Sequence, residues 1–238
     1  MPTKLIDLTQ LLNEKMLVYP DTAPPTFQVT NTVEKDGYNE HLISMLSHTG
    51  THVDAPRHML KGGKPLDQFP LDKFTGRAMI IDCRGRDEIS LDFLQPFESK
   101  IASVEFVLFY TGWQHRWNTG SYFDNCPIPT KEAAIWLTGF NLKGIGLDAF
   151  SVDTIGSATT VNEENLPNHY VFLRKEVLLL ENLTNLDKLP DSPFTFQCFP
   201  LRVEDADGSP VRAVAIIDEQ LTGWKHKQDY AELDIQVS

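Results

Sequence analysis

The stretch that most constrains the local fold runs from residue 47 to residue 58 and reads Ser-His-Thr-Gly-Thr-His-Val-Asp-Ala-Pro-Arg-His. Gly50 and Pro56 interrupt it, so a regular helix across it is not expected. Four groups that can bind a metal or move a proton stand at its even-numbered positions: His48, His52, Asp54 and His58. In an extended segment alternate side chains share one face. The spacing therefore predicts four convergent polar groups, provided that Gly50 and Pro56 leave the backbone extended.

Imidazole and carboxylate groups in this stretch are ligands that zinc and manganese accept. The alternative is that the histidines are solvated or only hydrogen-bonded within the fold. An aspartate, a glycine and a third histidine beside the His-x-x-x-His spacing favour a metal site. No thiolate lies nearby, so zinc is the ion that the donor set suits best and manganese is the second choice.

The same stretch resembles the H-x-G-T-H-x-D-x-P-x-H pattern of the metal-dependent cyclase family, which includes bacterial kynurenine formamidase (arylformamidase) and isatin hydrolase. Every fixed position of the pattern is present between residues 48 and 58. Further segments similar to the family lie at residues 7–9, 146–153 and 200–213. The loop at residues 19–21 lacks the glycine that the family has there. The resemblance covers residues 5–217.

A second group of ligands is implied downstream. The apolar run Val177–Leu180 ends at Glu181. A carboxylate at the end of a buried strand needs a cation or a metal as its partner. The resemblance carries the metal-ligand role over to Glu181 and His169. It also places Tyr19 near the substrate, although a plain surface loop fits Tyr19 equally well.

The chemistry that these residues support is metal-assisted hydrolysis. The metal ligands are expected to be His48, His52, Asp54, His169 and Glu181. They would hold one ion, or two ions if Asp54 bridges them. Such an ion lowers the pKa of bound water from about 15.7 to near 7 and polarises a carbonyl. His58 is expected to act as general base and general acid.

Composition excludes several classes of function. The chain has 238 residues and a net charge of −12, which argues against nucleic acid and against an anionic membrane surface. It shows no apolar run long enough to span a membrane and no signal peptide at its start. Three widely spaced cysteines form neither a disulfide framework nor a thiolate zinc site. The expected compartment is the cytoplasm.

The pattern of apolar runs predicts one mixed α/β domain over residues 1–238. Strands are expected at residues 27–30, 40–45, 77–82, 104–110, 142–148, 177–180, 194–199 and 211–217. Helices are expected at 90–97, 130–140 and 163–175, with Ser90 and Thr130 as N-caps. Residues 4–25 are expected to form an ordered loop, 205–210 a turn, and 218–238 a tail or dimer arm. The resemblance implies a swivelling β/β/α fold and a homodimer or homotetramer.

The function implied by the resemblance is that of an arylformamidase, which hydrolyses N-formyl-L-kynurenine to L-kynurenine and formate in tryptophan catabolism. An isatin hydrolase, or a hydrolase of lactones or other cyclic amides, would share the same ligands. A non-catalytic metal-binding or small-molecule-binding protein is the alternative from another class, and a purely structural metal site is a third. The aromatic-rich residues 113–129 could wall a pocket or simply pack.

Overall fold

The computed structural model describes residues 3–154 and 162–217, so the tail or arm expected at 218–238 lies outside the described residues. One large sheet has the strand order β1-β11-β9-β5-β6-β7-β8-β4-β10. Its strands are β1 (Lys4–Asp7), β4 (His52–Asp54), β5 (Thr75–Asp82), β6 (Phe106–Tyr110), β7 (Gly144–Leu147), β8 (Leu178–Glu181), β9 (Phe194–Gln197), β10 (Gly208–Pro210) and β11 (Val214–Ile217). A separate hairpin pairs β2 (Thr26–Asn31) with β3 (Glu40–Ser44).

The helices are short. They are α1 (Val33–Asp36), α2 (Pro56–Met59), α3 (Leu91–Leu94), α4 (Glu98–Ile101), α5 (Lys131–Leu137) and α6 (Pro167–Leu173). Single 3-10 turns occur at Leu66–Gln68, Leu71–Phe74, Gln95–Phe97, Trp113–Arg116 and Leu186–Lys188. Within the described ranges, none of these helices has the length and apolarity needed to cross a bilayer.

The centre of the sheet is parallel and buried on both faces. Strands β5, β6, β7 and β8 run parallel to one another, and antiparallel strands flank them at both ends. Strand β6 is buried at every position. A strand covered on both faces reads as a continuous apolar run, which is why residues 104–110 were recognisable as a strand.

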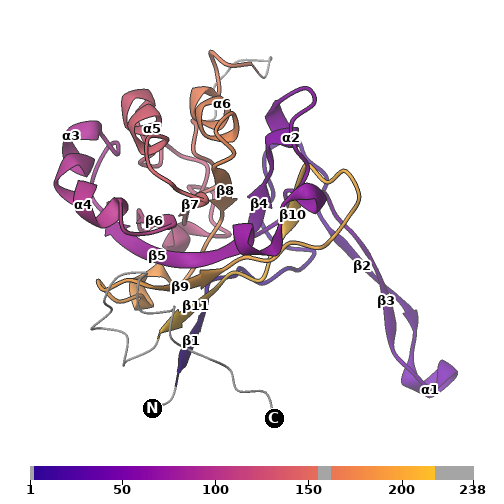
Figure 1. The fold of residues 1–238 in the computed structure, drawn as a ribbon. Coiled ribbons are helices and arrows are strands. Elements are labelled where there is room, and N and C mark those ends of the chain that lie inside the picture. The colour runs from indigo at the N-terminus through magenta and orange to yellow at the C-terminus, as the bar shows by residue number, and fades with distance from the viewer. Residues whose placement is uncertain (1–2, 155–161, 218–238) are drawn as a thin grey trace, which may run out of the picture.

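The two faces of the sheet meet two different cores. Along β6, Val107 and Phe109 pack on the helix side, whereas Phe106, Leu108 and Tyr110 pack on the other side against β8, β9 and β11. Figure 1 shows α3, α5 and α6 together on one side of the sheet, with β9, β11 and β1 curling beneath it. The result is one helix layer and two facing layers of strands. This arrangement confirms the predicted mixed α/β fold with its β/β/α layering.

Two helix N-caps agree with the sequence prediction. The Ser90 hydroxyl accepts a hydrogen bond from the backbone of Phe93 at 3.4 Å, and Thr130 does the same for Ala133 at 3.2 Å. The helix predicted over 90–97 is divided into α3 and a following 3-10 turn that contains Pro96. Proline lacks the backbone donor and crowds the preceding turn, so the division falls there.

Two sequence predictions were wrong. Residues 4–7 are not part of a loop but form β1, paired antiparallel with β11. Likewise, residues 208–210 of the predicted turn form β10, which pairs with β4. Both are very short edge strands, and the second contains Pro210, which only an edge position tolerates. Their partners lie far away in the sequence, so no local pattern indicated them.

The hairpin of β2 and β3 projects away from the body of the molecule and carries α1 at its tip (Figure 1). Gly37 closes the tip with a positive φ of 81°, a backbone conformation that glycine adopts without strain. All five residues of β3 are exposed. Apolar side chains on the hairpin, among them Val29, Leu42 and Ile43, are at least half exposed.

Candidate active site

The sheet brings the two predicted ligand segments together. Strand β4 lies between β8 and β10, and His52 on β4 is directly opposite Glu181, the last residue of β8. Asp54 is two residues further along β4, so it lies on the same face as His52. Helix α6 packs against β8 and supplies His169 from above. Residues separated by more than half of the sequence therefore share one site.

The extended segment expected over residues 48–58 is shorter than predicted, because only His52–Asp54 is a strand. Gly50 turns the chain before the strand with a φ of 65°. Pro56 begins α2 after it, at the helix position that proline favours. His48 therefore approaches from a turn and His58 from a helix. His48, His52, Asp54 and His58 still converge. They do so because a turn, a strand and a helix meet there, and not because their side chains alternate along one strand.

The inner part of the cluster is buried. His52 Nε2 lies 3.2 Å from Asp54 Oδ1 and 3.5 Å from Glu181 Oε2. His169 Nε2 lies 3.5 Å from Glu181 Oε1 and 3.8 Å from Asp54 Oδ2. The side chains of all four residues are 7% exposed or less. Two imidazoles and two carboxylates thus face one another inside the protein.

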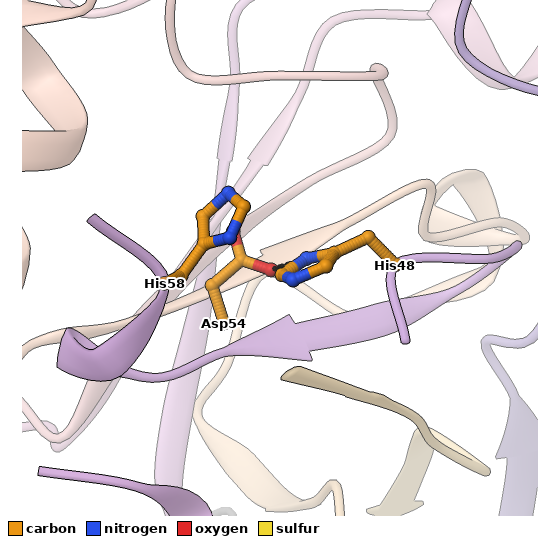
Figure 2. A group of neighbouring side chains, drawn as sticks. All are labelled: His48, Asp54 and His58. Carbon is orange, nitrogen blue, oxygen red and sulfur yellow. Dashed lines mark hydrogen bonds and ion pairs between the residues drawn. The ribbon is translucent and has the colours of Figure 1, made fainter. Parts of the chain in front are cut away.

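The outer part of the cluster uses the same aspartate. His48 Nδ1 lies 2.6 Å from Asp54 Oδ1, and the rings of His48 and His58 are 3.9 Å apart between centroids. Figure 2 shows Asp54 between His58, which comes from α2, and His48, which comes from the opposite side. These rings are more open than the inner ones, with side-chain exposures of 22% for His48 and 31% for His58.

Each of the three histidines that face Asp54 has an acceptor for its other ring nitrogen. His52 Nδ1 lies 2.8 Å from the Gly50 carbonyl oxygen. His169 Nδ1 lies 2.7 Å from Asp153 Oδ2. For His48 the outward nitrogen is Nε2, which lies 3.0 Å from a carboxylate oxygen of Asp207. Outer acceptors of this kind fix the tautomer and the ring orientation of metal-binding histidines.

Charges within the cluster displace several pKa values. Burial alone would lower the pKa of His48 and of His169, but the neighbouring carboxylates outweigh it and raise the pKa of each to about 10. Burial would raise the pKa of Asp54, but the adjacent imidazoles hold it well below its usual range. Burial and the charge of Asp54 raise the pKa of Glu181. Without a metal, protons on the histidines therefore balance the buried carboxylates.

His58 differs from the other histidines of the cluster. Burial, together with the charges of His48 and His169, lowers its pKa to about 4, and Asp54 only partly opposes this. Its imidazole is therefore neutral at pH 7. A neutral imidazole has an unprotonated nitrogen, which is the form that a general base requires.

The donor set fits a divalent metal ion. Two groups have all their candidate ligand atoms within 4.8 Å of one another: His52, Asp54 and Glu181, and His48, Asp54 and His58. Asp54 belongs to both groups. Across residues 3–154 and 162–217, neither buried carboxylate forms an ion pair with a lysine or an arginine. A cation bound at their meeting point would supply the compensating charge that buried carboxylates require.

The cluster opens into a cavity of about 470 Å³. Its apolar wall contains Leu17, Val18, Tyr19, Leu46, Met59, Trp117, Tyr122, Phe123, Phe150 and Leu166. The predicted substrate residue Tyr19 lies on this wall, with its ring edge toward Phe123 at a centroid distance of 6.1 Å. Residues 113–129 both wall the cavity and pack, since Tyr122 is 1% exposed and donates its hydroxyl proton to Asn182.

Two neighbouring residues have roles that local sequence reasoning did not reach. Asp207 contacts His48, whereas the sequence placed it in a turn and in a family-like segment and indicated no role for it in the site. Asn182 donates from its amide to the Gly50 carbonyl oxygen at 2.9 Å and so ties β8 to the first motif. Asp153, which lies in the family-like segment at residues 146–153, accepts hydrogen bonds from both the backbone and the ring of His169. The available signals were the position of Asn182 directly after Glu181 and, for Asp207, the family-like segment at residues 200–213.

The chain is similar to known proteins along most of its length. The family described as putative cyclase matches residues 6–154. Kynurenine formamidase of Bacillus cytotoxicus is 32% identical over 210 residues, which is 88% of this chain and 95% of the relative. The enzyme of the same name from Geobacillus thermodenitrificans is also 32% identical, over 87% of this chain and 95% of its own length.

Solved structures show the same fold. Isatin hydrolase A from Ralstonia solanacearum superposes with a TM-score of 0.78 at 28% identity, covering 91% of this chain and 92% of the other. Isatin hydrolase A from Labrenzia aggregata, bound to benzyl benzoate, gives a TM-score of 0.79 at 28% identity, over 91% of this chain and 94% of the other. Sequence and structural similarity therefore extend well beyond the motif.

Proposed function

This chain belongs to the putative cyclase family and is an amidohydrolase, and we propose that its substrate is N-formyl-L-kynurenine, which it hydrolyses to L-kynurenine and formate. The single observation that carries the proposal is the buried cluster around Asp54, which opens directly into an aromatic-walled cavity. The kynurenine formamidases are similar along nearly their whole length. An aromatic wall suits the aryl group of such a substrate.

Within this proposal, five residues hold the metal: His48, His52, Asp54, His169 and Glu181. Nitrogen and oxygen donors without thiolate suit zinc, and manganese is the second choice. Because Asp54 belongs to both candidate groups, the site has donors for one ion or for two. A bound divalent ion would polarise the scissile carbonyl and make a water molecule more acidic.

The proposed task of His58 is proton transfer. Its neutral imidazole lies at the open side of the cluster and lines the cavity. It would take a proton from the attacking water and return it to the nitrogen of the leaving arylamine, so that formate and the free amine result. The proposed task of Tyr19 is to hold the aryl ring from the rim of the cavity.

A second candidate substrate class is the cyclic aromatic amides, of which isatin is the example. One observation favours it: among the described residues that line the cavity there is no lysine or arginine. The carboxylate of an amino-acid substrate would meet neither a lysine nor an arginine there. A neutral lactam needs none. A non-catalytic binding protein is not retained, because the relatives named above are hydrolases.

We also propose a homodimer or homotetramer located in the cytoplasm. Exposed apolar side chains on the projecting hairpin support the oligomer, since solvent-exposed apolar surface of this kind marks contact sites. The cytoplasm is supported by three buried cysteines, none of them in a disulfide. Light scattering of the purified protein measures the oligomeric state directly.

The experiment that tests the substrate is a hydrolysis assay with N-formyl-L-kynurenine and isatin, each before and after removal of metal by a chelator. The proposal expects formylkynurenine to be hydrolysed, activity to disappear with the metal, and zinc or manganese to restore it. If the protein hydrolyses isatin and not N-formyl-L-kynurenine, its substrates are cyclic aromatic amides, as in the second candidate. No hydrolysis of either compound by metal-loaded protein would contradict both.

A further inference from the structure

Asp207 occupies a fixed position beside the cluster. It immediately precedes β10, and β10 pairs with β4 so that Gly208 lies opposite Asp54. The backbone carbonyl oxygen of Asp207 accepts a hydrogen bond from Ala55 at 2.9 Å. The main chain at Asp207 and directly after it is therefore tied to the segment that carries the first motif.

The carboxylate of Asp207 reaches two imidazoles. One of its oxygens, Oδ2, lies 3.0 Å from His48 Nε2 and 3.7 Å from His58 Nδ1. The opposite nitrogen of His48, Nδ1, is 2.6 Å from Asp54. His48 is thus held between two carboxylates, and His58 lies against the outer one. Asp207 therefore bridges His48 and the proposed general base, His58, from the solvent side.

The neighbouring glycine explains how the ring of His48 fits. A Cβ atom at Gly208 would lie 2.5 Å from Cε1 of His48. The imidazole therefore packs directly on the backbone of β10, where a larger residue would displace it. Asp207 and Gly208 together hold the ring of His48 in place. Asp207 forms a hydrogen bond with the ring, and Gly208 leaves room for it.

We propose that Asp207 is a positioning residue that sets the orientation of His48 toward Asp54 and of His58 toward the reacting carbonyl. The arrangement parallels that of Asp153 behind His169, where a carboxylate also holds the outward nitrogen. It differs because Asp207 contacts two rings, one a proposed ligand and the other the proposed base. This inference rests on the proposed function.

The test uses the full-length, metal-loaded protein and the variants Asp207→Ala and Asp207→Asn. Removing an outer carboxylate of this kind costs about 10–100-fold in metal affinity or in activity. We expect Asp207→Ala to lower kcat by about 10–100-fold while KM changes less than about threefold. The amide of Asp207→Asn keeps an acceptor for His48, so it should recover part of the loss.

The matched control is Asp205→Asn. Asp205 lies two residues away in the same segment and pairs with Arg57 instead of a histidine. It has a φ of 58°, a conformation that asparagine also tolerates. This control should keep kcat, KM and metal affinity at the wild-type values. If it loses as much activity as Asp207→Ala, the effect is a general one of the segment and the proposal is wrong.

A second readout does not depend on the substrate. Competition between each protein and a chromophoric chelator for zinc gives the metal Kd, which we expect to weaken by about 10–100-fold in Asp207→Ala. If the wild-type protein hydrolyses neither candidate substrate, the substrate assignment fails while this readout still tests Asp207. Unchanged Kd and unchanged kcat in both Asp207 variants would overturn the inference.

Discussion

The two sides of Asp54 are built differently. On the inner side, His52, His169 and Glu181 are 4–7% exposed and come from strands β4 and β8 and helix α6. On the outer side, His48 and His58 are 22% and 31% exposed and come from a turn and a helix of four residues. One carboxylate joins the two sides.

This difference separates the buried ligands from the more exposed side, which holds the proposed base His58 together with one further proposed ligand, His48. Strand pairing fixes the inner residues, because His52 is directly opposite Glu181 in the sheet. Groups that are buried and held in this way are suited to retain an ion. Inner and outer residues all line the cavity, but the outer rings are the ones more exposed to water and to a substrate. Removal of an inner residue should therefore remove the metal, whereas removal of His58 should leave the metal and stop the reaction.

The largest effect is expected for Asp54→Asn, because both sides depend on it. We expect loss of bound metal and a fall in kcat/KM of about ten-thousandfold, which corresponds to about 5 kcal/mol of transition-state stabilisation. Elemental analysis and the hydrolysis assay measure the two effects. Asp82→Asn, an exposed carboxylate at the end of β5 that pairs with Arg84, is the control. A fully metal-loaded Asp54→Asn protein would remove the basis of the comparison.

His58→Ala should separate the two sides. We expect metal content equal to that of the wild type and a fall in kcat of about a thousandfold, the range of a lost general base. Glu181→Gln, on the inner side, should instead lose metal and activity together. Wild-type hydrolysis by His58→Ala would show that this histidine is not the base.

The pH dependence of metal binding should report the protonation of one histidine on each side, His169 on the inner side and His48 on the outer side. Both His48 and His169 have a pKa raised to about 10, so both carry a proton at pH 7 in the metal-free protein. A metal ion must displace such a proton, so apparent affinity should rise by about tenfold per pH unit for each proton released, until pH approaches 10. Calorimetry in buffers of different ionisation enthalpy counts the protons. An affinity independent of pH between 6 and 8 would contradict this charge assignment.

Asp153→Asn should weaken metal binding through the inner residue His169 alone. The carboxylate holds the outward nitrogen of His169 at 2.7 Å, and loss of such a partner costs about 10–100-fold in metal affinity. Chelator competition measures this change. Since Asp153 also binds two backbone amides of α6, a melting curve of the metal-free variant must accompany it. Wild-type affinity in a correctly folded variant would show that His169 needs no such support.

The smallest effect is expected at the rim of the cavity. Tyr19→Ala removes a ring that meets Phe123 edge to face. A contact of this type between Tyr19 and the aryl ring of the substrate would contribute about 1 kcal/mol, so KM should rise by about fivefold while kcat and metal content stay unchanged. Steady-state kinetics with both candidate substrates decides this. A fall in kcat with constant KM would mean that Tyr19 acts on the reaction and not on binding.

The sequence predicted the parts of the site that depend on local pattern. His52 and Asp54 share a face because they are two residues apart on a strand, and Glu181 was noticeable as an acid that ends an apolar run. The choice of His169 required the family resemblance, since nothing local distinguishes it from other histidines. Asp207 was interpreted as a turn residue because its position depends on β10 pairing with β4, which residues 208–210 do not signal.

For the fold as well, the sequence predicted the elements that have a local pattern and missed those that depend on distant partners. Long apolar runs identified the buried central strands, whereas the short edge strands β1 and β10 depend on distant partners and were read as loop and turn. Propensity is weak for so few residues, and tertiary pairing decides them. For the cavity wall, the sequence indicated Tyr19 and residues 113–129, but a run of aromatic residues does not reveal which rings face inward.

The most direct test of the central claim is a crystal structure of the metal-loaded protein with anomalous diffraction at the zinc edge. The account predicts an anomalous peak at bonding distance from Asp54, about 2.0–2.2 Å for a zinc–oxygen bond. Its other neighbours should come from the remaining proposed ligands, His48, His52, His169 and Glu181. A peak elsewhere in the molecule, or none in protein that hydrolyses its substrate, would contradict the assignment of Asp54 and the division of labour built around it.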